Sequence, residues 1–549
     1  MLERLTTPES IEQARSRIEQ MLDERGEWFY TSRQSDAKRV SKSEAAGALR
    51  KGEWELRAAH GSLLLSLLTD AGARVWRIVA WEWTGERLVF EATRRMRREH
   101  ATIELIPRAS VGAERALLLE ARRALCERLA ALAAAQHPSA KLETVALSRG
   151  ARRGEPGRYA RILLSTRDAR IAVTGAVVEE GAHDADALLT SALIWLARLR
   201  EATRERRPLR LHLVAAPGTT RALSERLALL REELRSLVSV YETDEARQSL
   251  SRALAPTLDE LLACAPRFSP PTETSLSRTA QEIIALAPDA IDALRVRQGE
   301  TLRFHGLPFA RVRRLLGREQ VWFGVEAATR SGTTGDALPA SVGRGASPRR
   351  RLLDATNRAE FLKLVADLAE HRRADADNKR HAFYRAAPEA WLESILRRDI
   401  TRLDPGLRLS PLHTQFRTSR TSLSGASRPI DLLALRHDGR LVVVELKVSE
   451  DAALPLQGAD YWRRISAHQR AGHVKLARLF GDAEISDDPP LVYLVAPMLS
   501  FHRAFPALAR CINPRIELYR FDINEDWRAG VRVARRGRVG VINEGMLEG

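Results

Sequence analysis

Two carboxylates and one lysine stand inside an apolar stretch near the C-terminal end of the chain. Asp431 opens one apolar run, and Glu445 and Lys447 flank Leu446 at the end of the next, which contains three consecutive valines. Unpaired charge is costly to bury among Val and Leu side chains, so these groups need a compensating partner. Carboxylate and carbonyl oxygens are the ligands that hard divalent cations prefer. The residue types therefore indicate a metal site suited to phosphodiester hydrolysis.

The relative position of the two acids depends on the turn between their predicted strands. A two-residue turn would place Asp431 on the opposite sheet face from Glu445. A three-residue turn over residues 437–439, with Gly439 in the left-handed conformation, sets Asp431 directly opposite Glu445. Because side chains alternate between faces, Lys447 then shares that face. We predict the three-residue turn.

Two predicted helices supply further polar groups. The helix that opens at Pro455 carries Gln457 and Tyr461, which are four residues apart and hence on one face. Upstream, residues 388–396 have apolar side chains at helical spacing, and Glu393 lies near the edge of that apolar stripe. Both helices support a site built around the strand pair.

These residues resemble the signature of the PD-(D/E)XK nuclease superfamily, and in particular its RecB-type branch, which contains a QxxxY motif. Asp431 matches the first metal acid of the family. Glu445 and Lys447 match its E-x-K, and Gln457 and Tyr461 match QxxxY.

The resemblance covers residues 380–525 and departs from the family pattern at two points. The motif's proline is displaced by one position, to Pro429. No clear upstream histidine motif of the RecB-type branch is present, and His381 is only a loose candidate for it.

The resemblance implies a metal-dependent nuclease in which Asp431, Glu445 and the carbonyl group of Leu446 hold Mg²⁺ or Mn²⁺. Lys447 would orient or polarise the attacking water, and Glu393 would assist from the first helix. Gln457 and Tyr461 would position the phosphate. The implied fold is a restriction-endonuclease-like αβ core, a mixed central sheet flanked by helices. The implied partner is DNA, with RNA not excluded and a homodimer left open.

The E-x-K signal has a simpler alternative, because exposed edge strands often carry a Glu and a Lys as a surface pair. The chain has eight lysines among its 88 basic residues. A lysine two positions after a glutamate, at the end of an apolar strand, is therefore improbable by chance. Gln457 and Tyr461 taken singly are also ordinary helix-surface residues.

The overall composition sets looser limits on function. A net charge of +17 suits a nucleic-acid partner, because neutralising phosphates releases counterions. The excess of arginine over lysine also fits a GC-rich coding bias, so the charge adds little. Cys126, Cys264 and Cys511 form neither a disulfide framework nor a CxxC zinc motif, and they are too few for a four-cysteine iron–sulfur cluster. No GxxxxGK motif is present, which argues against an intrinsic ATPase.

The N-terminal residues predict a helix rather than a targeting segment. Thr7 is a suitable N-cap and Pro8 a suitable first helical residue. An apolar signal core is lacking, and no apolar run approaches the length of a membrane span. We expect a cytoplasmic protein.

The sequence contains an internal similarity, in which the region around Arg161 corresponds to the region around Asp431. From Asp431 onward the predicted order is strand, turn, strand, helix, a strand that ends at Pro497, helix and strand. The same order runs from Tyr159 to Tyr241, with a strand that ends at Pro217. A period this long indicates duplicated domains rather than a solenoid. The alternative is that any two α/β segments with Leu/Val-rich strands look alike.

The pieces that precede this order also correspond. A predicted helix over 114–135 and a strand over 142–147 stand where the helix near Glu393 and a predicted strand over 407–409 stand later. In the earlier copy the chemistry is missing. At one uniform offset, the two acids and the lysine are replaced by Arg161, Gly175 and Val177, and a shift of one position restores no carboxylate. We interpret this region as a degenerate nuclease-like lobe, kept for DNA clamping or pseudo-dimer contacts.

The sequence predicts an α/β protein of five segments. In chain order these are an N-terminal helix plus a β-rich unit (1–110), a degenerate nuclease-like α/β domain (111–250), a small β-containing unit (251–330), a Gly/Ser/Pro-rich flexible linker (331–350) and the PD-(D/E)XK nuclease-like domain (351–549).

The function that follows is a Mg²⁺-dependent deoxyribonuclease with a catalytically inactive second lobe that aids substrate binding. One alternative is a non-catalytic nucleic-acid-binding protein built on nuclease-like folds. The other is an interaction scaffold that does not bind DNA.

Overall fold

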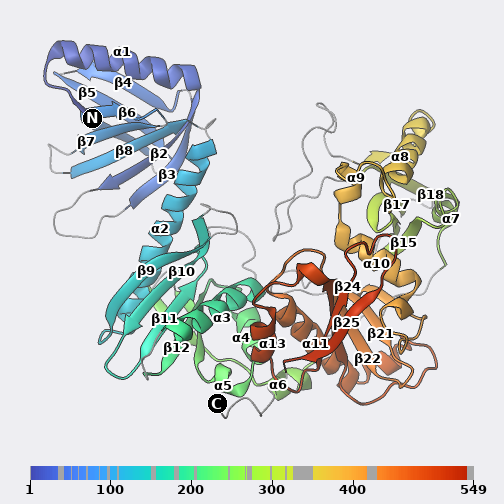
Figure 1. Ribbon diagram of the computed structural model, residues 1–549. Coiled ribbons are helices and arrows are strands. Elements are labelled where there is room, and N and C mark those ends of the chain that lie inside the picture. Colours follow the sequence, from blue (N-terminus) through green and yellow to red (C-terminus); the bar gives the residue numbers. More distant parts are fainter. Residues whose placement is uncertain are drawn as a thin grey trace. The chain divides into compact units, whose positions relative to one another are not determined.

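The computed structural model describes most of the chain (Figure 1). The described residues are 2–34, 43–50, 52–59, 61–69, 72–85, 87–94, 99–107, 111–149, 156–177, 185–202, 207–244, 248–265, 268, 275–296, 299–315, 318–325, 350–416 and 429–540. Apart from Arg350, the linker predicted over 331–350 lies outside them.

The chain divides into two compact units. The first unit comprises Met1–Gly181, Arg206–Val214 and Thr243–Ser251. The second comprises Ala182–Glu205, Ala215–Glu242 and Arg252–Gly549. The residues predicted to do chemistry all lie in the second unit.

The first unit opens with a helix on an antiparallel sheet. Helix α1 (Pro8–Arg25) begins at the predicted cap, where the Thr7 hydroxyl accepts a hydrogen bond from the Ser10 N–H at 3.2 Å. The strands, in sheet order, are β3 (Ser43–Arg50), β2 (Glu27–Gln34), β8 (Glu99–Pro107), β7 (Leu88–Arg94), β6 (Gly72–Trp83), β5 (Ser62–Thr69) and β4 (Trp54–Ala59), with β1 (Glu3–Arg4) beside β6. Tryptophan, leucine and isoleucine side chains from both layers form the core.

Helix α2 (Val111–Gln136) follows and packs on two strands of another sheet. The strands of this sheet that lie mainly in the first unit are β9 (Lys141–Arg149), β10 (Pro156–Ser165), β11 (Arg170–Gly175), β12 (Leu209–Ala215) and β14 (Ser249–Ala253). Strand β10 is antiparallel to both β9 and β11, and β11 is parallel to β12. Strand β11 is buried along most of its length, and β10 is buried over residues 162–164.

In the second unit, a small antiparallel sheet precedes the residues predicted to do chemistry. Its strands are β15 (Ile291–Val296), β16 (Gly299–Phe304), β17 (Leu307–Leu315), β18 (Arg318–Phe323) and β19 (Arg351–Leu352). Helices α7 (Arg278–Ile284) and α8 (Arg358–His371) contribute to its core, in which Phe309 stacks on Phe361.

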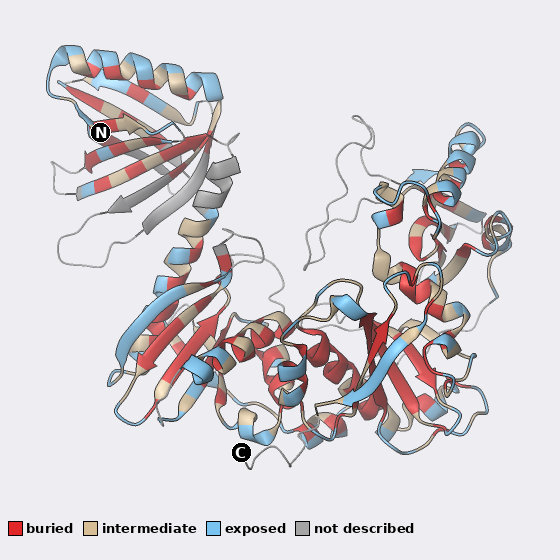
Figure 2. Cartoon of the chain, viewed as in Figure 1, coloured by how far each residue is buried: buried red, intermediate tan, exposed pale blue. Residues whose placement is uncertain are grey.

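The C-terminal sheet is mixed. In sheet order its strands are β20 (His413–Phe416), β21 (Ile430–Leu435), β22 (Leu441–Leu446), β23 (Leu491–Pro497), β24 (Leu518–Ile523) and β25 (Val533–Val539). Neighbouring strands are antiparallel except that β22, β23 and β24 run parallel. The parallel strands β22 and β23 are buried along their whole length (Figure 2), as expected for strands covered on both faces.

Two helices cover the opposite faces of this sheet. Helix α10 (Pro388–Arg398) packs through Trp391 and Leu392 on the face that includes Val442 and Val444. Helix α11 (Leu454–Arg470) packs through Tyr461 and Ile465 on the face that includes Leu441 and Val443. The odd-numbered positions of β22 therefore face α11.

The turn between β21 and β22 has the predicted three residues. The Arg436 N–H donates to the Arg440 carbonyl at 2.9 Å, and Gly439 has φ of +81°. In the resulting register Leu432 pairs with Val444. The predicted turn is thus confirmed.

The strand predicted over 407–409 is wrong. Leu407 forms only an isolated bridge to Arg436, and β20 is the strand that pairs with β21. Leu407 is fully buried, whereas Leu409 is exposed. A Leu-Arg-Leu alternation this short does not distinguish a strand from a loop that buries one side chain.

The remaining elements connect these layers. They are α3 (Ala185–Ala202), α4 (Thr220–Leu227), α5 (Glu232–Arg235), β13 (Val238–Asp244), α6 (Leu258–Ala263), α9 (Ala382–Arg385), η1 (Ile400–Arg402), α12 (His473–Leu476), η2 (Met498–Ser500) and α13 (Phe505–Cys511). Within the described ranges, no helix is both long enough and apolar enough to cross a membrane.

Candidate functional site

The strand pair β21–β22 brings the two predicted acids and the lysine together. Continuing its register sets Asp431 opposite Glu445, on the face that α11 covers. The Asp431 Oδ2 atom accepts a hydrogen bond from the Leu446 N–H at 2.9 Å. The Lys447 Nζ atom lies 2.8 Å from Glu445 Oε1. The side chains of Asp431, Glu445 and Lys447 thus lie together on one face of the sheet, at the carboxyl end of β22.

These carboxylates are incompletely compensated. Glu445 is only 2% exposed, and its Oε2 atom is buried without a hydrogen-bond partner. Burial, together with the neighbouring Glu445, raises the pKa of Asp431 well above its ordinary value of 3.8. A buried carboxyl group with a raised pKa beside a second carboxylate is an arrangement that occurs often at functional sites.

The lysine remains a cation at this site. Burial alone would lower the pKa of Lys447, but the carboxylates of Glu445, Glu389 and Asp431 outweigh it and raise the pKa above its ordinary value. A permanently charged ammonium group cannot act as a general base at neutral pH. It can donate hydrogen bonds and offset negative charge.

Helix α11 places the other two predicted residues beside the acids. Gln457 is 3% exposed, with its Nε2 atom 3.4 Å from Asp451 Oδ2 and its Oε1 atom buried without a partner. Burial, and then the nearby charges of Glu445 and Asp431, raise the pKa of the Tyr461 phenol. Tyr461 therefore stays protonated and can donate a hydrogen bond.

The approach of α11 to the sheet requires a glycine. A Cβ atom at Gly458 would lie 2.6 Å from Leu494 Cδ2 and 2.9 Å from Val492 Cγ1, both on β23. Contacts this short do not occur between carbon atoms. The absence of a side chain at Gly458 thus lets the helix bring Gln457 and Tyr461 close to the strand ends.

Glu393 is held by partners of its own. Its Oε1 atom accepts a hydrogen bond from Arg303 Nη1 at 3.0 Å, and its Oε2 atom accepts one from Gln415 Nε2 at 2.6 Å. Both Arg303 and Glu393 are buried, and Arg303 also pairs with Asp292 at 2.8 Å. These contacts use both oxygens of the acid predicted to assist from the first helix.

A second acid on the same helix lies closer to the lysine. Glu389 is one turn before Glu393, and its carboxylate accepts a hydrogen bond from the Val448 N–H. Burial raises the pKa of Glu389, and Glu445 raises it further, while the charge of Lys447 opposes both. Glu389 was not among the residues predicted from the sequence, although its spacing of four residues from Glu393 placed both on one helix face.

The residues present fit a divalent cation of the kind the sequence predicts. In the described part of the chain, no three His, Cys, Asp or Glu side chains cluster as a metal site. The predicted metal ligands do not need such a cluster, because they comprise two carboxylates and one backbone carbonyl, that of Leu446. The unpartnered Glu445 Oε2 atom and the raised pKa of Asp431 are the features that a bound cation would relieve. His381, the loose histidine candidate, instead stacks on His371 with ring centroids 3.8 Å apart.

The earlier strand pair, β10–β11, carries no such group. Neither strand contains Asp or Glu. Val173 lies opposite Ile162 and pairs with His212 of β12, whose Nδ1 atom lies 3.2 Å from His137 Nε2, just after α2. The odd-numbered positions of β11 therefore face α2. Val173 and Ile162 are both buried and apolar.

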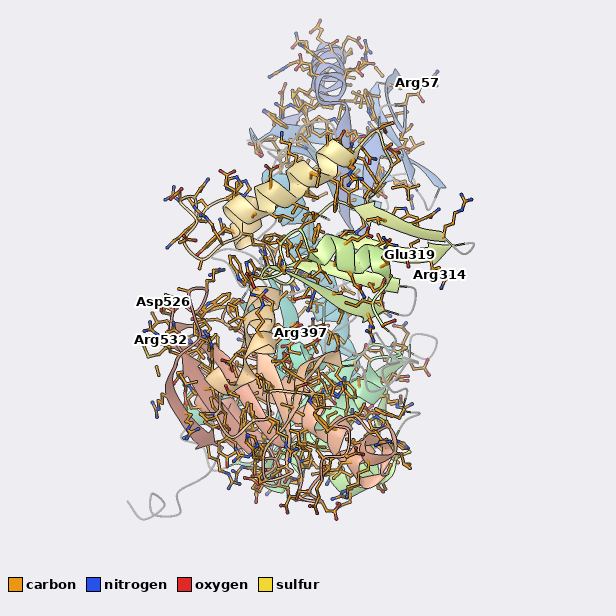
Figure 3. The ribbon with its side chains drawn as sticks, turned by 90° about the vertical axis from the view of Figure 1, so that its right-hand side faces the viewer. Arg57, Arg314, Glu319, Arg397, Asp526 and Arg532 are labelled. Carbon is orange, nitrogen blue, oxygen red and sulfur yellow. The ribbon has the colours of Figure 1, made fainter. Side chains whose placement is uncertain are left out.

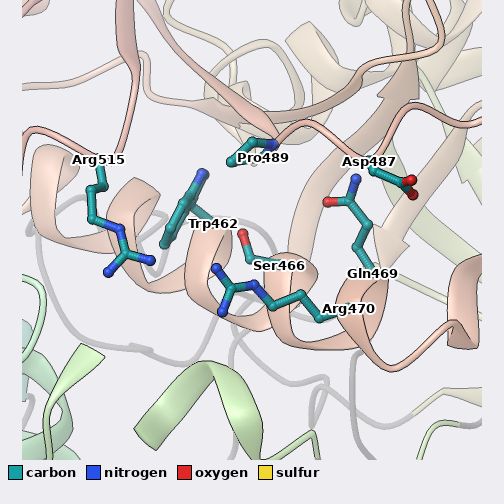
Figure 4. A pocket seen from close by; sticks show the side chains of 7 residues that line it. All are labelled: Trp462, Ser466, Gln469, Arg470, Asp487, Pro489 and Arg515. Carbon is teal, nitrogen blue, oxygen red and sulfur yellow. The ribbon is translucent and has the colours of Figure 1, made fainter. Parts of the chain in front are cut away.

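A cavity of about 220 Å³ lies at the other end of α11 (Figure 4). It is lined by Trp462, Ser466, Gln469, Arg470, Asp487, Pro489 and Arg515. None of these residues belongs to the predicted site. Because the acids lie at the carboxyl end of β22 whereas Pro489 precedes β23, the cavity and the acids occupy opposite ends of the parallel strands.

Some of the surface charge is paired locally (Figure 3). Arg314 stands opposite Glu319 on β17 and β18, and Arg532 lies 3.4 Å from Asp526. The net charge therefore overstates the positive charge that is free to meet a phosphate.

Comparisons with known proteins give little further information. No protein-family model matches the chain, and no curated protein matches it. Among solved structures, an XisH family protein from Nostoc punctiforme shares 13% identity over 23% of this chain and 96% of its own, with a TM-score of 0.16. A structure of an EndoMS–dsDNA complex shares 16% identity over 47% and 98%, with a TM-score of 0.16. A repair endonuclease from Pyrococcus abyssi shares 13% identity over 39% and 88%, with a TM-score of 0.11. TM-scores this low carry no weight in assigning fold or function.

Proposed function

We propose that the C-terminal α/β region is a PD-(D/E)XK nuclease domain that hydrolyses phosphodiester bonds in DNA with Mg²⁺ or Mn²⁺. One observation carries this proposal: Asp431, Glu445 and Lys447 converge on the sheet face that also receives Gln457 and Tyr461. If Glu445 and Lys447 were only an ion pair at the protein surface, water would solvate both side chains. Glu445 is instead buried, and one of its carboxylate oxygens has no hydrogen-bond partner. The sequence resemblance supports the same assignment.

Asp431, Glu445 and the Leu446 carbonyl would hold the cation. When bound, the ion lowers the pKa of a coordinated water and offsets charge on the reacting phosphate. The Lys447 ammonium group orients the attacking water and faces the developing negative charge. In the reaction, the water oxygen bonds to phosphorus, the bond from phosphorus to the leaving sugar oxygen breaks, and one water proton ends on that oxygen.

Three further residues assist in this proposal. Tyr461, which stays protonated, donates a hydrogen bond to a phosphate oxygen, and the Gln457 amide helps to hold the same group. Glu389, rather than Glu393, is the acid of helix α10 that assists the reaction, because both oxygens of Glu393 accept hydrogen bonds from Arg303 and Gln415. The Glu393 ion pair instead fixes α10 against β16.

The test is cleavage of three DNA substrates (linear duplex, single-stranded and supercoiled) and of single-stranded RNA by the full chain with Mg²⁺ or Mn²⁺, and with EDTA. Metal-dependent cleavage that Glu445→Gln abolishes would support the proposal. If wild type and Glu445→Gln cleave none of the three substrates, the proposal fails. Salt-dependent DNA binding without cleavage would then favour the non-catalytic alternative, and cleavage of RNA alone would correct the substrate.

A further inference from the structure

Two exposed apolar side chains lie beside the candidate metal site. Helix η2 follows β23 directly and carries Met498, which is 50% exposed, and Leu499, which is 74% exposed. Single exposed apolar residues are common on protein surfaces. In the described part of the chain, these are the only two large exposed apolar residues that are consecutive. The pair is therefore a candidate for contact with a partner.

Two hydrogen bonds anchor this short helix. The Leu499 N–H donates to Glu525 Oε1 at 2.9 Å. The Ser500 hydroxyl donates to the Val448 carbonyl at 3.2 Å. Val448 follows β22 and Glu525 follows β24, and these strands are the two neighbours of β23 in the sheet. Helix η2 is thus held from both sides, with its two apolar side chains exposed.

The bond to Val448 also places η2 close to the metal site. Strands β22, β23 and β24 are parallel, so they end at the same edge of the sheet, which is the edge that carries the acids. Val448 is the residue after Lys447. Consecutive Cα atoms are 3.8 Å apart, so the path from Leu499 through Ser500 and Val448 to Lys447 is on the order of 15 Å. Successive nucleotides of one DNA strand are about 3.4 Å apart, so Leu499 lies within about four nucleotides of a phosphate bound at Lys447.

Basic side chains accompany the apolar pair. Arg503 follows η2 closely and is exposed, as is Arg198 on α3. Burial lowers the pKa of His502. The carboxylates of Glu450 and Asp451 raise it, and the charges of Arg503 and Arg198 lower it. Both guanidinium groups therefore lie near the segment that follows β22. Positive charge beside an apolar pair suits a DNA strand, which presents charged phosphates and the apolar faces of its bases.

We propose that Met498 and Leu499 form an apolar wedge that enters the base stack of duplex DNA beside the scissile phosphate. The inference rests on the proposed nuclease function. Leucine and methionine are among the side chains that unstack a base step by insertion and kink the duplex. Because Glu445 is buried, a kink beside the site helps one phosphate of the duplex to approach it.

The first test compares cleavage of one labelled sequence as duplex and as single strand, by the full chain with Mg²⁺. A single strand has no paired stack to open. Leu499→Gln keeps the length of the side chain and removes its apolar character. It should lower the ratio of duplex to single-strand rate by about tenfold, the low end of what unstacking one base step costs. Leu499→Phe, which is large and apolar, should keep the ratio close to that of wild type.

The matched control is Leu476→Gln. Leu476 is 82% exposed on α12, and its neighbour Lys475 pairs with Asp487, which precedes β23. Its substitution should leave the ratio unchanged. If Leu499→Gln leaves the ratio unchanged as well, the inference is overturned and the nuclease function stands. If Leu499→Gln instead changes the oligomeric mass of the protein at an unchanged ratio, the pair is a contact between copies.

Permanganate, which oxidises unstacked thymines, tests the wedge without relying on rates. Glu445→Gln protein bound with Mg²⁺ to a thymine-rich duplex should make thymines reactive within about four nucleotides of the bond that the wild type cuts. Combining it with Leu499→Gln should abolish this reactivity at equal occupancy. A duplex that the wild type cuts and whose bound thymines stay unreactive would refute the wedge alone, as would cleavage of single strands only. Absence of all cleavage would refute the nuclease function and the wedge with it.

Discussion

The strand pairs β10–β11 and β21–β22 have the same local architecture and opposite chemistry. Each is antiparallel, and the second strand of each runs parallel to the next strand of its sheet. The earlier pair contains no Asp or Glu, and its directly opposed residues Ile162 and Val173 are buried and apolar. The apolar pair shows that this arrangement needs no buried charge. The acids of the later pair thus carry a cost in stability that a function must explain.

The largest effect should come from removing a metal acid. Glu445→Gln should lower the cleavage rate by roughly 10³-fold, the scale seen when a group that stabilises the transition state is lost. The matched control is Asp168→Asn, an exposed carboxylate in the turn between β10 and β11, which should change the rate less than twofold. If both variants cleaved a labelled duplex at the same rate, the β21–β22 pair would have no catalytic role that the β10–β11 pair lacks.

The converse substitution places an acid in the apolar pair. Val173→Glu should lower the free energy of unfolding by about 3 kcal/mol or more at pH 8, because no lysine or cation compensates a carboxylate there. The loss should shrink as the pH falls towards 5 and the new carboxyl group protonates. Urea unfolding at the two pH values measures this, with Val173→Gln as the control for shape. A Val173→Glu protein as stable as wild type would mean that the strand pair tolerates charge.

Substitutions of the two acids of α10 should have different effects. Glu389→Gln should slow cleavage by about 10- to 100-fold with little change in the melting temperature, as for groups that support a metal site. Glu393→Gln should instead lower the free energy of unfolding by about 3 kcal/mol, because Arg303 loses a buried ionic partner. Rates and urea unfolding curves of both variants decide the assignment. The reverse pattern would return the catalytic role to Glu393.

The smallest effect is a gain in stability. Because the folded-state pKa of Asp431 is raised, ionising it costs the wild type stability as pH rises above its ordinary pKa of 3.8. Asp431→Asn should therefore be about 1–2 kcal/mol more stable than wild type at pH 8 without metal, while being inactive. Mn²⁺ should raise the melting temperature of the wild type and not of the variant. Thermal unfolding with and without Mn²⁺ tests both points, and Asp168→Asn serves as the neutral comparison.

Much of the local structure followed from residue patterns. Gly439 fixed the turn, and the alternation of β22 placed Glu445 and Lys447 on one face. The helix acid was harder, because Glu389 and Glu393 are equivalent in pattern. Partners distant in sequence distinguish them: Arg303 and Gln415 bind Glu393, whereas Glu389 lies beside Lys447. The domain boundaries and the metal remain predictions.

The predicted internal similarity shows where residue patterns lose precision. The sequence predicted one uniform offset, which takes Arg161 to Asp431. The turn between β10 and β11 has four residues, 166–169, where the turn between β21 and β22 has three, so one offset cannot match both strands of the two pairs. Strand pairing, which joins residues distant in sequence, supplies the register that a uniform offset cannot.

Gly458 makes one part of the site intolerant of sequence drift. Any other residue would add at least a methyl group where Leu494 Cδ2 and Val492 Cγ1 leave no room. Either those two buried side chains would have to turn away, or the helix would have to lift from the sheet and move Gln457 and Tyr461 outward with it. The lack of a side chain at Gly458 thus sets the distance between α11 and the sheet, and with it the position of Gln457 and Tyr461 relative to the acids.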